Sequence, residues 1–267
     1  MNLRRGCDNG PGTSEAATRL DHGPPSESEL RVMRVDVWSD VVCPWCYVGL
    51  ANLGSALDGY EHEDDVEVVL HSFQLDPGAP QRDEQPLEER LAQKYGASVG
   101  QIRAQQARIV SLGAERGIDF RFDQAIGGNT FDAHRLLHLA RIRGVQLELK
   151  HALGRAYFTD GEPIGEPETL RARALEVGLD PDEVDAVLAG DAFAAEVRED
   201  LDAARRIGIN GVPFFVVDGR LGISGAQPPE TLRDLLEQGW LTREPAPVQV
   251  VAGSPDVDAC GPDGCEI

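Results

Sequence analysis

The stretch Asp40-Val-Val-Cys-Pro-Trp-Cys46 decides the fold of this chain. A short β-type run, Met33-Arg-Val-Asp-Val-Trp38, precedes it, and a helical pattern from Tyr47 to Leu57 follows it. Cys43 and Cys46 are therefore predicted to lie at a strand-to-helix junction. The first amide N–H groups of a helix have no intrahelical partner, and together with the helix dipole they favour negative charge. We expect this field to stabilise a thiolate at Cys43, and the thiolate is the reactive form of cysteine.

The two cysteines have the spacing of a redox pair. Pro44 suits the first helical turn, because it has no N–H to satisfy and its φ is already helical. Cys46 lies one turn further on, where it can attack a mixed disulfide on Cys43, so we predict Cys43 as the nucleophile and Cys46 as the resolving thiol. Half of a four-cysteine zinc site is the alternative interpretation. Such a site needs a second C-x-x-C pair, which the sequence lacks, and no metal is predicted.

Composition argues against several classes of function. The 267 residues suffice for one large or two modest units, and 41% of them are hydrophobic, enough for a core. The formal charge of −21 disfavours nucleic acid and anionic membranes as partners. The sequence contains no apolar run of about 18 residues that would span a membrane, and no apolar stretch follows the N-terminus as an export signal requires. We expect a cytoplasmic protein, in which cysteine pairs are catalytic rather than structural.

The N-terminal segment is expected to lie outside the fold. Residues 1–32 are rich in Gly, Pro, Ser, Asp and Glu and contain no aromatic residue. Such a composition cannot bury enough apolar surface to offset the entropy of ordering, so a disordered tail is predicted, in which Cys7 is incidental. Met33 stands directly before the first predicted strand and is an alternative start of translation.

The C-terminal segment carries a second pair of cysteines. Residues 241–267 are predicted to form a flexible tail that ends in Cys260-Gly-Pro-Asp-Gly-Cys265-Glu-Ile. The four residues between the cysteines are turn-forming, so the two sulfurs can meet without help from a core. One hypothesis is a second redox pair that exchanges with Cys43 and Cys46, since exchange needs only an accessible thiolate and contact. Two incidental thiols in a disordered terminus are the alternative.

Between the two tails, the predicted elements follow the order βαβ, helices, ββα. Strands at 34–38 and 66–73 flank a helix at 44–56, which predicts a right-handed crossover with parallel strands. Strand character returns at 213–217, where Asp218-Gly219 predicts a hairpin turn, and a last helix begins at Pro228-Pro229 and ends near Gly239. The remaining predicted pieces are helices at 86–95, 98–116, 129–143, 145–158, 167–178, 181–190 and 191–207, an extended segment at 119–123 and the returning strand at 220–224.

Four stretches together resemble the DsbA-like superfamily, in its FrnE-type branch of cytoplasmic disulfide oxidoreductases. The resemblance implies an α/β, thioredoxin-like fold that is split by a large all-helical insertion. It assigns residues 33–76 and 208–240 to the thioredoxin-like domain and residues 77–207 to the insertion. The four stretches are Ser39–Cys46, Asn129–Leu136, Gly211–Phe215 and Gly225–Gln227.

The resemblance also implies an activity and a set of site residues. It implies a thiol–disulfide oxidoreductase that needs no bound cofactor and whose partners are protein or small-molecule thiols and disulfides. A cis peptide bond is implied before Pro213, which leaves the Val212 backbone able to pair with an extended substrate. Trp45, Asn129 and His134 are implied to line the substrate groove. Because Trp45 replaces the histidine of periplasmic DsbA, the strong oxidant role of DsbA does not transfer.

Two other classes of function remain open at this point. The glutathione-dependent 2-hydroxychromene-2-carboxylate isomerases and the kappa-class transferases share the split fold and a similar Asn-Thr…His-Arg helix. They typically have serine where this chain has Cys43, and they lack the second cysteine, so the intact pair argues against them. A non-catalytic protein that binds peptides or serves a polyketide pathway is the other alternative.

Three further polar residues have two interpretations each. His134 and His138 are four residues apart, which is metal-ligand spacing, but no carboxylate completes a recognisable zinc motif. Packed or surface histidines are therefore the favoured interpretation. Asp36 alternates with Val35 and Val37 beneath the active site, where a buried carboxylate could relay protons to Cys46. A surface or edge position is the favoured interpretation for Asp36.

Overall fold

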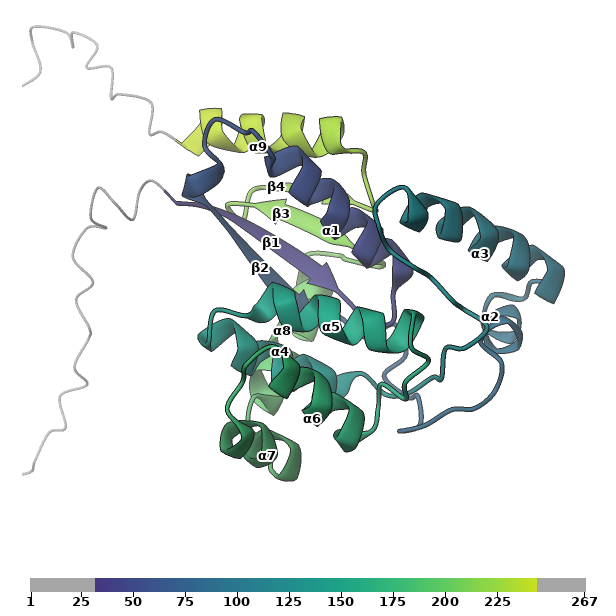
Figure 1. The fold of residues 1–267 in the computed structure, drawn as a ribbon. Helices are drawn as coiled ribbons and strands as arrows, with labels where there is room; N and C mark the ends of the chain where they lie inside the picture. The colour runs from purple at the N-terminus through teal and green to yellow at the C-terminus, as the bar shows by residue number, and fades with distance from the viewer. Residues whose placement is uncertain (1–31, 244–267) are drawn as a thin grey trace, which may run out of the picture. The chain divides into compact units, whose positions relative to one another are not determined.

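The computed structural model describes residues 32–243, which contain a four-stranded mixed sheet with helices on both faces (Figure 1). The strand order is β2-β1-β3-β4, with β1 parallel to β2 and antiparallel to β3, and β3 antiparallel to β4. This is the predicted thioredoxin-like arrangement, and the parallel β1–β2 pair follows from the helix that connects them. The strands are β1 Met33–Ser39, β2 Val66–Ser72, β3 Phe214–Val217 and β4 Leu221–Ser224.

Helices α1 (Pro44–Leu57) and α9 (Pro229–Arg243) cover one face of the sheet (Figure 1). Alternate residues of a strand point to the same face, so every second side chain of β1 meets these two helices. The shared core holds α1 firmly against the strand that leads into the cysteine pair. Its members include the buried aliphatic side chains Val35, Val37, Leu50, Leu53, Leu232 and Leu236.

Helix α8 (Ala194–Arg206) packs on the opposite face, beside β2. Trp38 of β1 faces this side, where its ring packs with Ala204 and Val216 and its indole N–H donates to the backbone oxygen of Asp200 at 3.2 Å. The last helix assigned to the insertion therefore closes the second face of the sheet. The domain boundaries at residues 77 and 207 stay a prediction.

The other helices of the insertion form a second core, which reaches the cysteine-bearing helix. Val41, which precedes α1, and Tyr47 and Val48 of α1 are buried with aliphatic side chains of α4 and α5, such as Leu136 and Leu153. The insertion is thus docked on the strand-to-helix junction. None of the helices between residues 32 and 243 is long and apolar enough to cross a membrane. The bounds are α2 Leu87–Tyr95, α3 Val99–Ala114, α4 Phe131–Ile142, α5 Gln146–Phe158, α6 Pro167–Glu176 and α7 Pro181–Ala189, with a 3₁₀ turn at Glu63–Asp65.

The predicted end of the last helix is wrong. Helix α9 continues through Gly239 to Arg243, although glycine is a common helix stop. A Cβ at position 239 would lie 2.3 Å from Val217 Cγ1 and 3.3 Å from Met33 Sδ. Glycine at this position therefore permits close packing of the helix on the sheet and does not end the helix.

Three smaller predictions also need correction. Helix α8 begins at Ala194 and not at Asp191, because Phe193 adopts a left-handed conformation with φ 62°. The hairpin turn has three residues, 218–220, since Val217 pairs with Leu221. The predicted extended segment at 119–123 is too long, because residues 122–124 form a turn.

Candidate active site

The two cysteines lie where the sequence predicts, at the start of α1. Cys43 is the N-cap residue, Pro44 occupies the first helical position, and Cys46 lies within the first turn. Both thiols are reduced. Cys43 is 4% exposed and Cys46 is 0% exposed, so of these two residues only Cys43 can contact a molecule at the surface.

The environments of the two thiols push their pKa values apart. The Cys46 thiol donates a hydrogen bond to the Cys43 sulfur, and this bond is the main cause that lowers the pKa of Cys43, against the effect of burial. The N-terminus of α1 adds a favourable field for the anion. Burial, followed by the hydrogen bond to Cys43, raises the pKa of Cys46 well above its usual value. The pair therefore consists of one thiol that ionises easily and one that stays protonated.

The loop before β3 faces the nucleophile. The Val212–Pro213 peptide bond is cis, as the family resemblance implies. The Cys43 thiol lies 3.5 Å from the Val212 carbonyl oxygen, to which it donates a hydrogen bond. Pro213 is buried and Val212 is half-buried, so the backbone at Val212 borders the reactive sulfur.

Asp40, three residues before Cys43, is a fully buried carboxylate that the sequence analysis did not single out. It accepts the N–H groups of Val41 at 2.7 Å and Leu75 at 2.8 Å, and His134 Nε2 lies 3.2 Å from Oδ1. Burial opposes ionisation, but the contacts with His134 and Leu75 hold the pKa of Asp40 below its usual value. The carboxylate thereby fixes the segment that leads into the cysteine pair.

Of the three residues implied to line the groove, only Trp45 borders a cavity beside Cys43. His134 is 1% exposed and contacts Asp40, so the structure gives it a supporting position behind the site. The Asn129 side chain donates to the backbone oxygens of Pro77 and Ala79, both at 3.1 Å, and accepts the Phe131 N–H at 2.9 Å. Its polar atoms hold the chain together, and direct contact of Asn129 with substrate remains a prediction.

The cavity beside Cys43 has a volume of about 330 Å³. Helices α2 and α3 of the insertion form one wall, and the loop that ends at Val212 forms another. Among residues 32–243, every side chain that lines it is uncharged, although 27% of the residues in the chain are charged. Its apolar walls include Leu91, Tyr95, Ile102, Ile109, Phe122 and Phe158.

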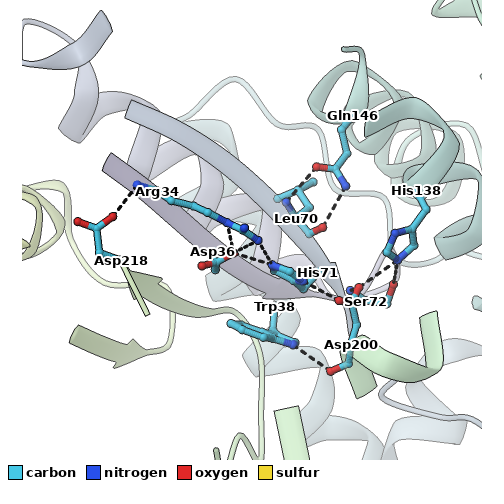
Figure 2. A network of polar contacts seen from close by, with 10 residues as sticks. All are labelled: Arg34, Asp36, Trp38, Leu70, His71, Ser72, His138, Gln146, Asp200 and Asp218. Atoms are coloured by element: carbon cyan, nitrogen blue, oxygen red, sulfur yellow. Dashed lines mark hydrogen bonds and ion pairs between the residues drawn. The ribbon is translucent and has the colours of Figure 1, made fainter. Parts of the chain in front are cut away.

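Asp36 does not lie beneath Cys46. It is 9% exposed on the central strand β1, so the favoured prediction of a surface or edge position is wrong. Its side chain points to the face opposite α1, where Oδ1 accepts from Arg34 Nε and contacts His71 Nε2, both at 2.7 Å (Figure 2). These partners hold the pKa of Asp36 below its usual value against the effect of burial.

Asp36 belongs to a cluster that we call the Asp200 network, made of Asp36, His71, His138 and Asp200 (Figure 2). Asp200 Oδ1 lies 2.6 Å from His71 Nδ1, and Oδ2 lies 3.0 Å from His138 Nε2. Burial works against both charges, but the hydrogen bonds raise the pKa of His71 and keep that of Asp200 far below its usual value. His134 and His138 thus contact different carboxylates, despite their metal-ligand spacing.

Lys150 was not predicted as a site residue. This α5 side chain is 0% exposed, and its ammonium donates to the backbone oxygen of Asp40 at 2.7 Å. It also lies 5.0 Å from the centre of the Tyr47 ring. The sequence did contain a signal, because Lys150 falls on the apolar face of its helix, at helical spacing from Leu153 and Tyr157, where a charge is unexpected. Cys7, Cys260 and Cys265 lie outside the described residues.

The fold and the cysteine pair define a thioredoxin-like protein with an inserted helical unit. The sequence model of the DSBA-like thioredoxin domain matches residues 34–237, and the chain belongs to this family. The DsbA-like resemblance is thereby confirmed, while the narrower FrnE-type assignment stays a prediction.

Three relatives illustrate the match. The crystal structure of the probable DsbA oxidoreductase SCO1869 from Streptomyces coelicolor has a TM-score of 0.76 at 45% identity and covers 88% of this chain and 99% of its own. Cytosolic disulfide reductase DsbM from Pseudomonas aeruginosa shares the fold, with a TM-score of 0.55 at 21% identity over 78% of this chain and 99% of DsbM. The uncharacterized protein YwbO of Bacillus subtilis (strain 168) is 28% identical over 197 residues, which are 73% of this chain and 90% of YwbO.

Proposed function

We propose that this protein is a thiol–disulfide oxidoreductase in which Cys43 is the nucleophile and Cys46 the resolving thiol. The observation that carries the proposal is the asymmetric placement of the pair. Cys43 is the N-cap residue of α1 and contacts the Val212 carbonyl, whereas Cys46 is fully buried within the first turn, and these surroundings lower the pKa of Cys43 and raise that of Cys46. A thiolate that forms easily is the better attacking group, and a buried protonated thiol does not compete with it for substrate.

The reaction proceeds through a mixed disulfide. The Cys43 thiolate attacks one sulfur of a substrate disulfide, a Cys43–substrate bond forms, and the other substrate sulfur leaves as a thiolate. Cys46 then attacks Cys43, which releases the second substrate sulfur and leaves a Cys43–Cys46 disulfide. The reverse sequence oxidises a dithiol substrate, so the same residues serve either direction.

The surroundings of Cys43 favour an extended, apolar substrate. The carbonyl of Val212 borders the sulfur and suits pairing with the backbone of an extended chain. The adjoining cavity of about 330 Å³ has uncharged walls and suits an apolar side chain next to the reacting cysteine. We infer that peptides with a bulky apolar residue beside the cysteine are preferred over small charged thiols.

The glutathione-dependent isomerases and transferases are the second candidate. DsbM has also been solved with GSH, at 20% identity to this chain. Glutathione carries two carboxylates and one ammonium group, and between residues 32 and 243 no charged side chain lines the cavity that could pair with them. The retained Cys46 and this uncharged wall together favour the disulfide oxidoreductase. A cytoplasmic location remains a prediction from the sequence.

A trapping experiment tests the proposal. In Cys46→Ala the mixed disulfide cannot be resolved, so incubation with a disulfide-containing protein such as insulin should accumulate adducts on Cys43. Non-reducing electrophoresis and mass spectrometry identify the adduct, and Cys43→Ala is the matched control. The same preparations are assayed with glutathione and 2-hydroxychromene-2-carboxylate. Adducts that also form in Cys43→Ala, or isomerase turnover without adducts, would overturn the assignment.

A further inference from the structure

Lys150 is a buried lysine whose ammonium has no charged hydrogen-bond partner among residues 32–243, and burial lowers its pKa. Lysine side chains usually extend their ammonium to water, and removing that charge from water is expensive unless it is paired. Asp40 O is the one protein acceptor of Lys150 Nζ among residues 32–243, so two of its three N–H donors stay available. Lys94, the other lysine of the chain, is exposed to solvent and needs no such compensation.

The nearby carboxylate does not neutralise Lys150 through a direct contact. Both oxygens of Asp40 are engaged by the N–H groups of Val41 and Leu75 and by His134. The lysine is bound instead by the backbone oxygen of the same residue. Lys150 still interacts with the Asp40 carboxylate through space, but no hydrogen bond joins the two charges. Its ammonium can therefore also balance a negative charge that forms on sulfur, and it lowers the pKa of Asp40, Cys43 and Cys46.

Backbone and ring contacts tie Lys150 to the cysteine pair. The oxygen of Asp40 that accepts from Lys150 also accepts the Cys43 N–H, at 3.4 Å. The ring under the ammonium belongs to Tyr47, which follows Cys46 in α1. A Cβ at Gly154 would lie 2.1 Å from Tyr47 Cε1, so glycine at this position lets α5 approach the ring closely. The ammonium is thus held in place by groups on either side of the redox pair.

We propose that Lys150 is a positioning residue that supplies the positive charge for the resolving step at Cys46, an inference that rests on the proposed function. In this step Cys46 attacks Cys43, the Cys43–Cys46 bond forms, and the bond from Cys43 to the substrate sulfur breaks. The electron pair of that bond leaves on the substrate sulfur, which takes up the proton that Cys46 gives up. Because Cys43 is uncharged within the mixed disulfide, Cys46 is then the sulfur that bears the negative charge balanced by Lys150.

The test measures resolution separately from attack. In a full-length chain with Cys7, Cys260 and Cys265 replaced by serine, Cys43 is loaded with 5-thio-2-nitrobenzoate. The rate at which coloured 5-thio-2-nitrobenzoate is released then measures the rate of attack by Cys46. Lys150→Met retains length and apolar packing, Lys150→Arg retains the charge, and Lys94→Met is the matched control. Circular dichroism checks that each variant is folded.

We expect Lys150→Met to slow release at pH 7 by about tenfold or more, the effect of one pKa unit, and to move the pH midpoint upward. Lys150→Arg should recover part of the rate, and Lys94→Met should match the parent. A folded Lys150→Met variant with the parent rate and midpoint would overturn the proposal. If the parent neither accepts nor releases thiols at Cys43, the proposed function itself fails.

A second measurement needs no variant at Lys150. With [¹³Cε]lysine the wild-type protein gives only two lysine signals, because the chain contains only Lys94 and Lys150, and Lys94→Met assigns them. Oxidation of the cysteine pair removes the sulfur charge that favours the ammonium. The titration midpoint of Lys150 should therefore be lower in the oxidised than in the reduced protein, while that of Lys94 stays constant. Equal midpoints for Lys150 in the two forms would contradict the proposal.

Discussion

Two clusters of buried charge lie along β1 and just beyond its end, and they differ in how the charges are paired. In the Asp200 network, His71 lies between two carboxylates, with Asp36 at 2.7 Å and Asp200 at 2.6 Å. At the cysteine pair, Lys150 contacts a backbone oxygen and an aromatic ring, and no carboxylate pairs with it directly within the described part of the chain. In the Asp200 network the charged side chains contact one another directly. At the cysteine pair, the Lys150 ammonium has no such direct contact and can interact with a negative charge that forms on sulfur during a reaction.

This difference separates a structural cluster from a functional one. A buried ion pair whose members satisfy each other holds elements together, and removing one member is strongly destabilising. A buried titratable group that lies next to a nucleophile and lacks a full set of hydrogen-bond partners indicates a role in the reaction. Variants at the Asp200 network should therefore change stability more than thiol chemistry, and variants at the cysteine pair should do the reverse.

The largest expected effect is on turnover in Cys43→Ala. Insulin reduction in the presence of dithiothreitol should fall by roughly 10³-fold or more, as happens when a nucleophile is removed from other enzymes. Far-UV circular dichroism should match the wild type, since an alanine fits the N-cap position sterically. Cys7→Ala is the control and should retain activity. Substantial turnover in Cys43→Ala would show that exchange does not depend on this residue.

Asp200→Ala should affect stability and not thiol reactivity. Removal of this carboxylate leaves His71 Nδ1 and the Ser72 N–H without their acceptor and removes one contact of His138 Nε2, so we expect a loss of about 3–5 kcal/mol in the free energy of unfolding. Urea denaturation of the reduced protein measures it. Asp202→Ala on the same helix removes an exposed ion pair with Arg205 and should cost only about 0–1 kcal/mol. Equal losses in the two variants would refute the structural role of the network.

The Asp200 network should also shape the dependence of stability on pH. The pKa of Asp200 is lowered, so its contribution is present above the unfolded value of about 3.9 and is lost as the pH falls further. The pKa of His71 is raised, so its contribution is present below the unfolded value of about 6.5 and is lost as the pH rises through the folded value. The network therefore stabilises most between about pH 4 and pH 6.5.

A comparison of wild type with His71→Gln isolates this contribution. Above pH 6.5 the unfolding free energy of the wild type should decline relative to the variant, by up to about 1.4 kcal/mol per pH unit, the value for one proton. Urea denaturation from pH 5 to pH 8.5 measures the two curves. Parallel curves would mean that His71 is not protonated in the folded protein.

The smallest expected effect concerns the C-terminal cysteines. The double variant Cys260→Ser/Cys265→Ser should keep the fold and the Cys43–Cys46 pair, because residues between 32 and 243 form both cores that hold α1. If the tail pair exchanges with the main site, turnover with dithiothreitol should change by a few-fold, roughly the span of modest redox tuning. Unchanged turnover, together with the absence of any disulfide from Cys260 or Cys265, would identify them as passive thiols.

Local signals in the sequence predicted the parts of the fold that depend on local structure. Pro44 at the first helical position and the Asp218-Gly219 turn, where both residues have positive φ, mark elements that neighbours in the chain determine. The alternation of side chains along β1 also predicts the direction of Asp36. Since Val35 and Val37 face α1, Asp36 had to face the opposite side and could not lie beneath Cys46.

The supporting shell of the site could not be predicted in the same way. Lys150 and Asp40 are 110 residues apart, and their contact depends on how α5 of the insertion docks on α1. The role of Gly239 likewise depends on Val217, a residue of another element that no local pattern identifies. Local patterns thus located the reactive pair, whereas tertiary packing determines the groups that tune it.

The central claim is that the two thiols differ in ionisation, and alkylation as a function of pH tests it most directly. Reduced wild-type protein is pulsed with iodoacetamide at each pH, and chymotryptic cleavage after Trp45 separates Cys43 from Cys46 for mass spectrometry. The account predicts a midpoint for Cys43 below the free-thiol value of about 8.5 and one for Cys46 well above it. A midpoint for Cys43 at or above the free-thiol value, or earlier alkylation of Cys46, would contradict the account.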